Sequence, residues 1–335
     1  VFLIDVSGSM DSPDKLGVLK TGFKQLVDEL EPEDNVAIVV YAGQVGVLLP
    51  STPATEVKKI KNAVDKLGAG GSTAGAAGIT TAYEIAQENF IKGGNNRIIL
   101  GTDGDFNVGI ASVEELVKLI EEKRDSGIYL TVLGVGGGNL NDHMMEQIAN
   151  NGNGNYEYID NASEIQKVFV HEKSKFHTVA KDSKVQVTFN PDKVDSYRLI
   201  GYENRKLENE DFDDDKKDAG EIGAGQTITA LYEVVLKKTD TEGQYAKFDF
   251  RYKMLGSDVS QSLSTDVKEM PVEFTSASES TRFAIAVAGF GLLMRESEYR
   301  GSLSMEMVRE MAGSALTFDP HGYRKEFVEM INRLK

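Results

Sequence analysis

The first half of the chain alternates short apolar runs with helical patterns, and this alternation constrains the fold more than any other feature. The apolar runs suit buried strands and occupy residues 1–5, 35–42, 45–49, 97–103, 128–135 and 156–159. The helical patterns that follow them occupy residues 12–30, 57–67, 74–92, 112–126, 139–149 and 163–177. Parallel strands that are covered on both faces appear as continuous apolar runs. The order therefore predicts an α/β fold with a doubly wound, mostly parallel six-stranded sheet.

The pattern changes after about residue 181. Apolar residues then alternate with polar ones, as at Val185, Val187 and Phe189. This period of two is typical of half-buried strands in an antiparallel sheet. An acid-rich connection at 203–221 interrupts these strands. We expect a small antiparallel β-sandwich-like domain at residues 179–275, after an α/β domain at residues 1–178.

Helical spacing returns from residue 280 to the end of the chain. Residues 283–294 are almost all apolar, but this run is shorter than the ~20 residues that a membrane-spanning helix needs. A buried helix is therefore the prediction. Further helices are expected at residues 304–312 and after Asp319 and Pro320, where an acidic cap precedes a proline. We expect these helices to form a small C-terminal region at residues 276–335.

The charge of the chain limits its partners. The formal net charge of −16 argues against binding to nucleic acid and to an anionic membrane surface. There is no cysteine, which excludes disulfides and thiol catalysis and leaves the cellular compartment open. Because the chain begins inside a predicted strand, we expect an N-terminal segment to have preceded it.

The first predicted strand ends on a group of oxygen-bearing side chains. Asp5, Ser7 and Ser9 follow the apolar run, and Gly8 allows the backbone to turn tightly between them. Open α/β sheets bind their ligands at the carboxyl ends of their strands. A carboxylate and two hydroxyls with no nearby histidine or cysteine suit a hard cation, magnesium first and then manganese or calcium. These residues therefore predict a metal site.

Two later stretches extend this site and carry a resemblance. Thr73 lies in the glycine-rich stretch at 70–75, and Asp103 ends another buried-strand pattern in a Thr-Asp-Gly sequence. The DxSxS stretch, the loop threonine and the TDG stretch, in this order, resemble the metal-ion-dependent adhesion site of von Willebrand factor type A domains. The resemblance implies that the metal ligands are Asp5, Ser7, Ser9, Thr73 and Asp103.

The resemblance also implies a function. In this family the open coordination position of the metal accepts an Asp or Glu carboxylate of a partner protein. We therefore expect a divalent-metal-dependent, adhesion-type protein-binding module that is not an enzyme, with Mg²⁺ as its cofactor and Mn²⁺ or Ca²⁺ as substitutes. We expect no nucleic-acid partner and no membrane insertion by this part of the protein.

The order of the whole chain adds an expectation about location. A type A domain, a β region and C-terminal helices in succession resemble a group of bacterial type A domain proteins, which are often lipoproteins. The stretches that carry this likeness are 94–109, 198–205 and 218–225. The resemblance implies an extracytoplasmic protein of the periplasm or cell surface, anchored by an N-terminal segment outside this chain.

The same residues allow other interpretations. In the alternative without a metal, Ser9 or Ser12 and Thr73 simply cap helices and Asp103 closes a turn through its side chain. If a metal is bound, there are two alternatives to protein binding. The metal is purely structural, or it activates a water for hydrolysis, with Asp105 as the candidate general base.

Two further motifs were considered for other kinds of site. Residues 211–215 begin like a calcium-binding EF-hand loop, but Lys216 and Ile222 stand where that loop needs glycine and glutamate. A solvated acidic loop is therefore predicted there. A serine triad needs a histidine base, and none of the four histidines follows a predicted strand.

Overall fold

The computed structural model describes residues 1–72, 75–104, 113–137, 140–202, 206–238, 243–269 and 271–334. These residues form two compact units. The first unit comprises residues 1–183, 218–226 and 252–259, and the second comprises residues 184–217, 227–251 and 260–335.

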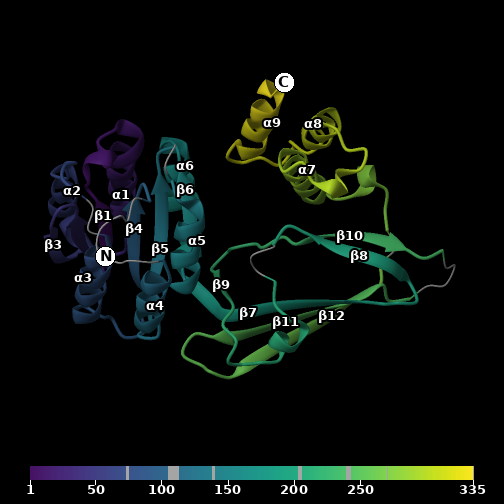
Figure 1. Ribbon diagram of the computed structural model, residues 1–335, viewed down its shortest axis with the longest axis horizontal. Coiled ribbons are helices and arrows are strands. Elements are labelled where there is room, and N and C mark those ends of the chain that lie inside the picture. Colours follow the sequence, from purple (N-terminus) through teal and green to yellow (C-terminus); the bar gives the residue numbers. More distant parts are fainter. Residues whose placement is uncertain are drawn as a thin grey trace. The chain divides into compact units, whose positions relative to one another are not determined.

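A six-stranded sheet forms the centre of the first unit (Figure 1). Its order is β3-β2-β1-β4-β5-β6, so that β1 lies between β2 and β4 and pairs in parallel with both. Only β3 runs antiparallel, beside β2. This sheet confirms the predicted doubly wound, mostly parallel fold. The strand bounds are Phe2–Asp5 for β1, Asn35–Tyr41 for β2, Val45–Pro53 for β3, Asn96–Thr102 for β4, Ile128–Val135 for β5 and Tyr156–Ile159 for β6.

Helices cover both faces of this sheet because successive strand residues point to opposite sides. Phe2 and Ile4 face one layer of helices, and Leu3 between them faces the other. The first layer contains α1 (Val18–Asp28), α2 (Val57–Asp65) and α6 (Ala162–Gln166). The second layer contains α3 (Gly75–Glu88), α4 (Val113–Arg124) and α5 (Asp142–Asn151).

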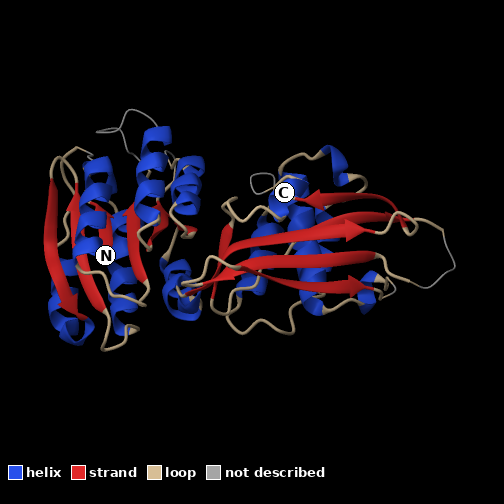
Figure 2. Ribbon diagram, turned by 90° about the horizontal axis from the view of Figure 1, so that it is seen from below, coloured by secondary structure: helices blue, strands red, loops and turns tan. Residues whose placement is uncertain are grey.

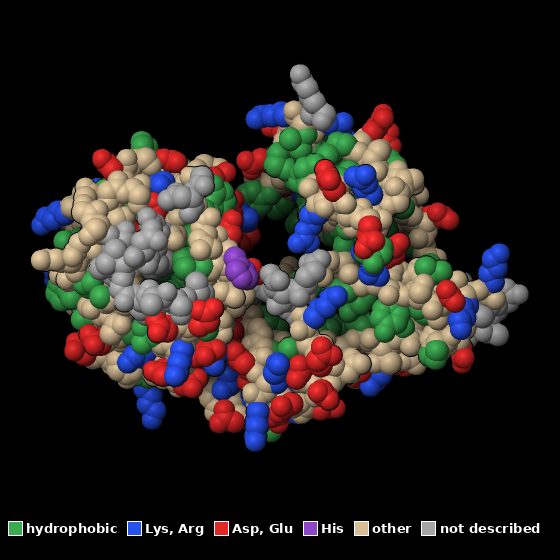
Figure 3. All heavy atoms as spheres, in the orientation of Figure 1, with side chains coloured by type: hydrophobic (Ala, Val, Ile, Leu, Met, Phe, Trp, Pro, Cys, Tyr) green, Lys and Arg blue, Asp and Glu red, His purple; other side chains and the backbone are tan. Residues whose placement is uncertain are grey.

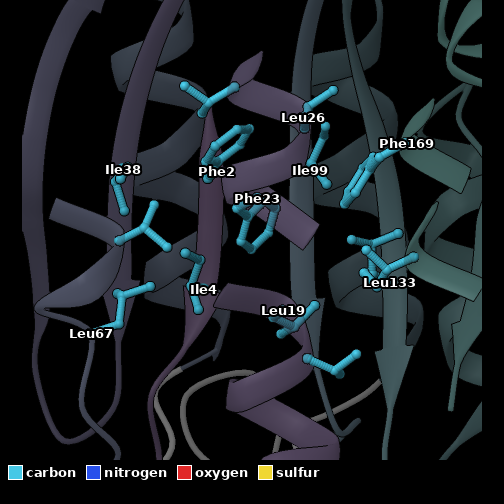
Figure 4. Packing of buried hydrophobic residues seen from close by; sticks show 14 of the residues in the cluster. Phe2, Ile4, Leu19, Phe23, Leu26, Ile38, Leu67, Ile99, Leu133 and Phe169 are labelled. Carbon is cyan, nitrogen blue, oxygen red and sulfur yellow. The ribbon is translucent and has the colours of Figure 1, made fainter. Parts of the chain in front are cut away.

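Aromatic rings fill the centre of the first layer (Figure 4). The ring of Phe23 on α1 stacks on that of Phe2 at 4.4 Å between centroids and lies 6.0 Å from the ring of Phe169. Phe23 and Phe169 are completely buried. Burial of such rings is a principal source of stability in a domain of this size.

The helix predicted at residues 163–177 is wrong as a single element. Helix α6 continues directly into a wider, π-type helical turn at Lys167–His171. A separate, tighter helical turn follows at Lys173–Phe176. The wide turn carries two consecutive residues, Val168 and Phe169, into the core, and both are fully buried. Packing of these side chains outweighs regular helical hydrogen bonding, and the sequence pattern does not reveal this competition.

Two sheets make up the β region (Figure 2). The larger has the order β12-β11-β7-β9, and the smaller pairs β10 with β8 in antiparallel orientation. The ring of Phe189 on β7 lies 4.3 Å from that of Tyr197 on β8 and 5.3 Å from that of Tyr232 on β10. These ring contacts connect the two sheets in the way that core side chains do in a β-sandwich. The bounds are Thr178–Phe189 for β7, Val194–Ile200 for β8, Gly220–Gly223 for β9, Leu231–Leu236 for β10, Ala246–Met254 for β11 and Ser260–Val267 for β12.

Strand β9 lies at the end of the stretch predicted as a connection, and it belongs to the first unit. Gly223 pairs with Thr178 of β7, and the Ala224 N–H donates to the carbonyl of His177 at 2.7 Å. A Cβ at Gly223 would lie 2.0 Å from the carbonyl oxygen of Lys175, so only glycine fits this approach. A segment more than forty residues farther along the chain therefore completes the first unit.

Three helices end the chain: α7 (Glu279–Met294), α8 (Met305–Gly313) and α9 (Tyr323–Arg333). The ring of Phe327 meets those of Phe283 and Phe290 edge to face, each at 5.5 Å. Within the predicted buried helix only Ala286 and Gly289 are fully buried. None of the helices in the described part of the chain has both the length and the apolar composition needed to cross a membrane.

Charged side chains are dispersed over the surface. On the face drawn in Figure 3, Asp and Glu side chains lie among Lys and Arg side chains. The excess of acidic residues is therefore distributed over this face. It does not gather there into a single acidic tract.

Candidate metal centre

Asp5 is held at the end of the central strand β1 by three hydrogen bonds. Its Oδ1 accepts from the Ser7 N–H at 2.9 Å. Its Oδ2 accepts from the hydroxyl of Thr102 at 3.0 Å and from the hydroxyl of Tyr41 at 3.2 Å. Asp5 is fully buried. Tyr41 and Thr102 end the neighbouring strands β2 and β4, so the parallel sheet itself supplies the groups that orient this carboxylate.

The two predicted serine ligands lie next to each other. A short helical turn at Gly8–Met10 brings the hydroxyl oxygens of Ser7 and Ser9 to 3.0 Å. Met10, the last residue of this turn, is completely buried and anchors the turn in the hydrophobic core. Within the described part of the chain, neither this turn nor the helical turn that Ser12 precedes has a side-chain cap. The alternative that Ser9 or Ser12 acts as a helix cap therefore gains no hydrogen bond in its favour.

Asp103 follows the end of β4, on the strand next to Asp5. Its side chain is almost fully buried, with 1% exposed. Gly104 after it has a φ of +86°, and a Cβ there would lie 2.3 Å from the Cε of Met145. The hydroxyl of Thr102, which donates to Asp5, also accepts from the Gly104 N–H at 3.1 Å. The TDG turn and the DxSxS turn are thereby linked through one hydroxyl.

The glycine-rich loop runs beside the DxSxS turn. The Gly8 N–H donates to the carbonyl of Gly71 at 3.0 Å, and the Gly70 N–H donates to the carbonyl of Val6 at 2.7 Å. Gly71 has a φ of +91°, which favours glycine there. The next predicted ligand, Thr73, lies outside the described residues, as does Asp105, the candidate general base. The structure thus brings Asp5, Ser7, Ser9 and Asp103 to one sheet edge.

The two carboxylates influence each other electrostatically. Burial raises the pKa of Asp5, and the negative charge of Asp103 raises that pKa further, whereas hydrogen bonds from Ser7 and Thr102 lower it. Two carboxylates in one buried site resist joint ionisation unless a positive charge compensates them. The site therefore has the electrostatic character of a cation-binding site.

Lys15 supplies one such positive charge, and sequence reasoning missed it. Its Nζ lies 2.9 Å from Oδ2 of Asp103 and donates to the carbonyl of Ser9 at 3.0 Å. The sequence placed Lys15 only near the start of a helix, because nothing local signals a contact across 88 positions. Tyr41 and Thr102 were missed for the same reason.

The donor set fits a hard divalent cation. Carboxylate and hydroxyl oxygens are the ligands that Mg²⁺ and Ca²⁺ prefer. Among the described residues no three His, Asp or Glu side chains form a group that could hold a metal. The predicted site differs from such a group because it uses two carboxylates and neutral hydroxyls.

The acidic loop at 211–215 is built differently from a calcium loop. The guanidinium of Arg251 contacts Asp213 at 3.3 Å and Asp215 at 2.8 Å. The Nζ of Lys184 donates to the carbonyl of Asp211 at 2.9 Å. Cationic side chains of the protein thus compensate the charge of this loop.

The fold, together with the site at the carboxyl ends of its central strands, defines a type A domain, and comparison with known proteins agrees. Residues 1–171 match the family model described as "von Willebrand factor type A domain", and the chain belongs to this family. Residues 174–335 match the model described as "Uncharacterized protein YfbK, C-terminal". Domains of the type A family often bind proteins, and those with the adhesion site bind divalent metals.

Several relatives cover different parts of the chain. YfbK of Escherichia coli (strain K12) is 44% identical over 99% of this chain and 60% of its own length. A UPF0353 protein of Mycobacterium sp. (strain KMS) is 37% identical over 32% of this chain and 35% of its own length. The chain thus spans less than two thirds of either relative.

One solved structure is similar over nearly the whole chain. The structure of a von Willebrand factor type A protein from Catenulispora acidiphila gives a TM-score of 0.55 at 17% identity. The match covers 99% of this chain and 81% of that one. At this identity the likeness concerns the fold alone.

Proposed function

We propose that the chain is a divalent-metal-dependent protein-binding module. Asp5, Ser7, Ser9, Thr73 and Asp103 would hold the cation, with Mg²⁺ as the proposed ion and Mn²⁺ or Ca²⁺ as substitutes. An Asp or Glu carboxylate of a partner protein would complete the coordination. The observation that carries the proposal is the meeting of two buried carboxylates, Asp5 and Asp103, with the adjacent hydroxyls of Ser7 and Ser9 at one sheet edge.

Each residue has a distinct part in this proposal. The neutral hydroxyls of Ser7 and Ser9 offer oxygen without adding negative charge. Asp5 is oriented by its bonds to Ser7 and Thr102, so it contributes charge from a fixed position. When bound, the cation would supply positive charge to an incoming carboxylate, which a protein of net charge −16 otherwise repels.

Asp5 is poorly suited to act as the general base of a metal-assisted hydrolysis. Both of its carboxylate oxygens already accept hydrogen bonds from Ser7, Thr102 and Tyr41. A carboxylate held in this way is a poor general base, because a base needs a free oxygen within reach of the proton it removes. Asp105, the candidate base, lies outside the described residues, so the proposal that the chain is not an enzyme rests on its membership of a family whose domains often bind proteins.

Titration calorimetry of Mg²⁺, Mn²⁺ and Ca²⁺ tests the metal site. The wild-type chain is compared with the double variant Asp5→Ala, Ser7→Ala and with a control variant Ser12→Ala, whose hydroxyl lies outside the proposed ligand set. Metal binding that is lost in the double variant and kept in the control supports the site. Equal binding in all three proteins would show that the metal binds at another site.

A second measurement tests the open coordination position. Mn²⁺ bound to the chain relaxes the protons of its coordinated water, and a carboxylate that takes the water's place lowers this relaxivity. Glutarate is expected to lower it, whereas glutaramide, the neutral diamide, is not. An unchanged relaxivity with glutarate would favour a purely structural metal, for which Asp103→Ala would also leave partner binding intact.

The location is proposed on the likeness to bacterial proteins. We infer an extracytoplasmic protein, anchored as a lipoprotein by a segment outside this chain. Fractionation of cells that express the parent protein, with incorporation of labelled palmitate, tests this. Recovery of the protein in the cytosol without label would contradict it.

A further inference from the structure

Lys15 is unusually enclosed for a lysine. It lies in the turn at Pro13–Gly17, directly after the DxSxS stretch, and only 14% of its side chain is exposed. Lysine side chains are seldom enclosed unless they are paired. The place of this lysine beside the proposed metal ligands therefore calls for an explanation.

The ammonium group is bound to the site itself. Its Nζ lies 2.9 Å from Oδ2 of Asp103, of whose side chain 1% is exposed, and 3.0 Å from the carbonyl oxygen of Ser9. Asp103 and Ser9 are both proposed to hold the metal. When an ion pair is largely buried, the loss of one partner leaves a poorly compensated charge.

The stem of Lys15 is held in place by the end of strand β5. Gly136 there has a φ of +76°, and a Cβ on it would lie 2.4 Å from Cε and 2.8 Å from Cγ of Lys15. The absence of a side chain at Gly136 thus leaves the space that the stem fills. The lysine is directed at Asp103 by the packing of the fold.

We propose that Lys15 is a tethered cation that competes with the divalent ion for Asp103. This proposal rests on the function proposed above. Without metal, the ammonium compensates the negative charge of Asp103. When metal binds, Lys15 withdraws from Oδ2 of Asp103, because two cations on one carboxylate repel each other. Lys15 therefore weakens metal binding and stabilises the metal-free protein.

The proposal predicts opposite effects of one substitution. Lys15→Met keeps an unbranched apolar stem and removes the charge. We expect this variant to bind Mg²⁺ and Mn²⁺ about tenfold more tightly, a coupling of ordinary size for two linked binding events. We also expect a lower melting temperature in EDTA and a smaller difference from the wild type at saturating metal.

Lys24→Met is the matched control for this experiment. Lys24 lies on α1 and also makes an ion pair of 2.9 Å, with Asp65, but both of these side chains are more exposed, at 37% and 55%. Its substitution is expected to leave the metal affinity unchanged. Calorimetry and thermal melts of the wild type and the two variants give both readouts. A Lys15→Met variant that binds metal equally or more weakly overturns the proposal.

Amine labelling of the unaltered protein gives an independent test, which does not depend on the folding of a variant. The protein is treated with an acetylating reagent with and without saturating Mg²⁺, and modification of each lysine is measured by mass spectrometry. Lys15 is expected to react faster with Mg²⁺, and Lys24 equally in both conditions. Unchanged or slower labelling of Lys15 overturns the proposal.

The failure of this proposal can be told apart from failure of the proposed function. If Asp5→Ala, Ser7→Ala binds metal as the wild type does, then the proposed site itself is wrong. If that double variant loses metal binding while Lys15→Met behaves as Lys24→Met does, then the site stands and the role of Lys15 is overturned.

Discussion

The central sheet of the first unit and the β strands of the second unit bury their side chains to very different degrees. Leu3, Ile4 and Leu100 in the sheet are completely buried. In the second unit, Tyr197 on β8 is 58% exposed and Leu263 on β12 is 59% exposed. The sheet is covered on both faces by helices, whereas β12 of the β region is exposed along nearly its whole length.

This difference explains where the candidate site lies. Two carboxylates and an ammonium group can remain close together in a buried place only if surrounding atoms hold them rigidly. The dense sheet provides that rigidity through Tyr41 and Thr102. The charges of the acidic loop at 211–215, in contrast, lie on the more exposed β region and pair with Arg251.

The largest expected effect comes from removing a ring from each core. Phe23→Ala should lower the free energy of unfolding of the first unit by about 3–5 kcal/mol, because the surrounding core cannot fully close the cavity that the missing ring leaves. Phe290→Ala in α7 should cost about 1–2 kcal/mol, since Phe290 is only partly buried. Urea denaturation with hydrogen exchange resolved by region gives both values. Equal losses would show that the two cores are equally tight.

Metal should stabilise one unit and leave the other unaffected. At 100 times its dissociation constant, Mg²⁺ should raise the unfolding free energy of the first unit by about 2.7 kcal/mol. EDTA should reverse this gain. Hydrogen exchange of peptides from β1 and β4 is expected to slow with Mg²⁺, while that of peptides from α8 is expected to stay constant. An equal rise in protection against hydrogen exchange in both regions would contradict the prediction that the metal stabilises the first unit alone.

The first unit should also respond to pH through Glu221 on β9. Burial and the nearby charges of Asp218 and Asp182 raise its pKa to about 8, and its Oε1 has no hydrogen-bond partner among the described residues. Between pH 4.5 and 8 the folded protein keeps a proton that the unfolded chain releases, so stability falls as the pH rises through this window. Above pH 8 the whole contribution is lost.

Glu221→Gln removes this dependence. The variant should be more stable than the wild type at pH 8.5 and should equal it near pH 4.5, because the amide stays neutral while the wild-type carboxyl of the unfolded chain ionises between these values. Glu84→Gln, at an exposed position of α3, is the control. Thermal melts from pH 4.5 to 9 measure the effect, and parallel curves for wild type and Glu221→Gln would exclude it.

The smallest effects are expected at helix caps. The side chain of Asn161 accepts from the N–H groups of Ser163 at 2.7 Å and Glu164 at 3.1 Å, ahead of α6. Ser304 accepts one bond, from the Met307 N–H at 3.2 Å, ahead of α8. Asn161→Ala should cost about 1 kcal/mol, and Ser304→Ala about half of that. A larger loss at Ser304, measured by urea denaturation, would reverse the order.

The elements of the six-stranded sheet could be predicted because local composition determines them. Buried parallel strands are apolar throughout, and the intervening helices carry their own spacing signals. Strands β8, β9 and β12 could not be predicted in this way. β12 has the sequence SQSLSTDV with few apolar residues, and β9 has four residues that depend on pairing with β7. Long-range pairing has no local signature.

The candidate site was predictable to the same extent. Asp5, Ser7, Ser9 and Asp103 lie at strand ends that the pattern revealed, so their meeting at one edge followed from topology. The roles of Tyr41, Thr102 and Lys15 depend on distances between residues far apart in the chain. The position of Lys15 also depends on Gly136, whose lack of a side chain matters only once β5 is in place.

The membership of β9 in the first unit bears on how this chain can be divided. The two family matches meet between residues 171 and 174. Yet Arg97 of β4 donates to the carbonyl of Phe176 at 2.9 Å, and the guanidinium of Arg124 on α4 pairs with Asp218, just before β9, at 2.6 Å. A type A domain excised at the sequence boundary would lose these acceptors and neighbours. The first compact unit is thus assembled from both family matches, so exchanging the type A domain for that of a homologue would also require the residues from the second match that complete it.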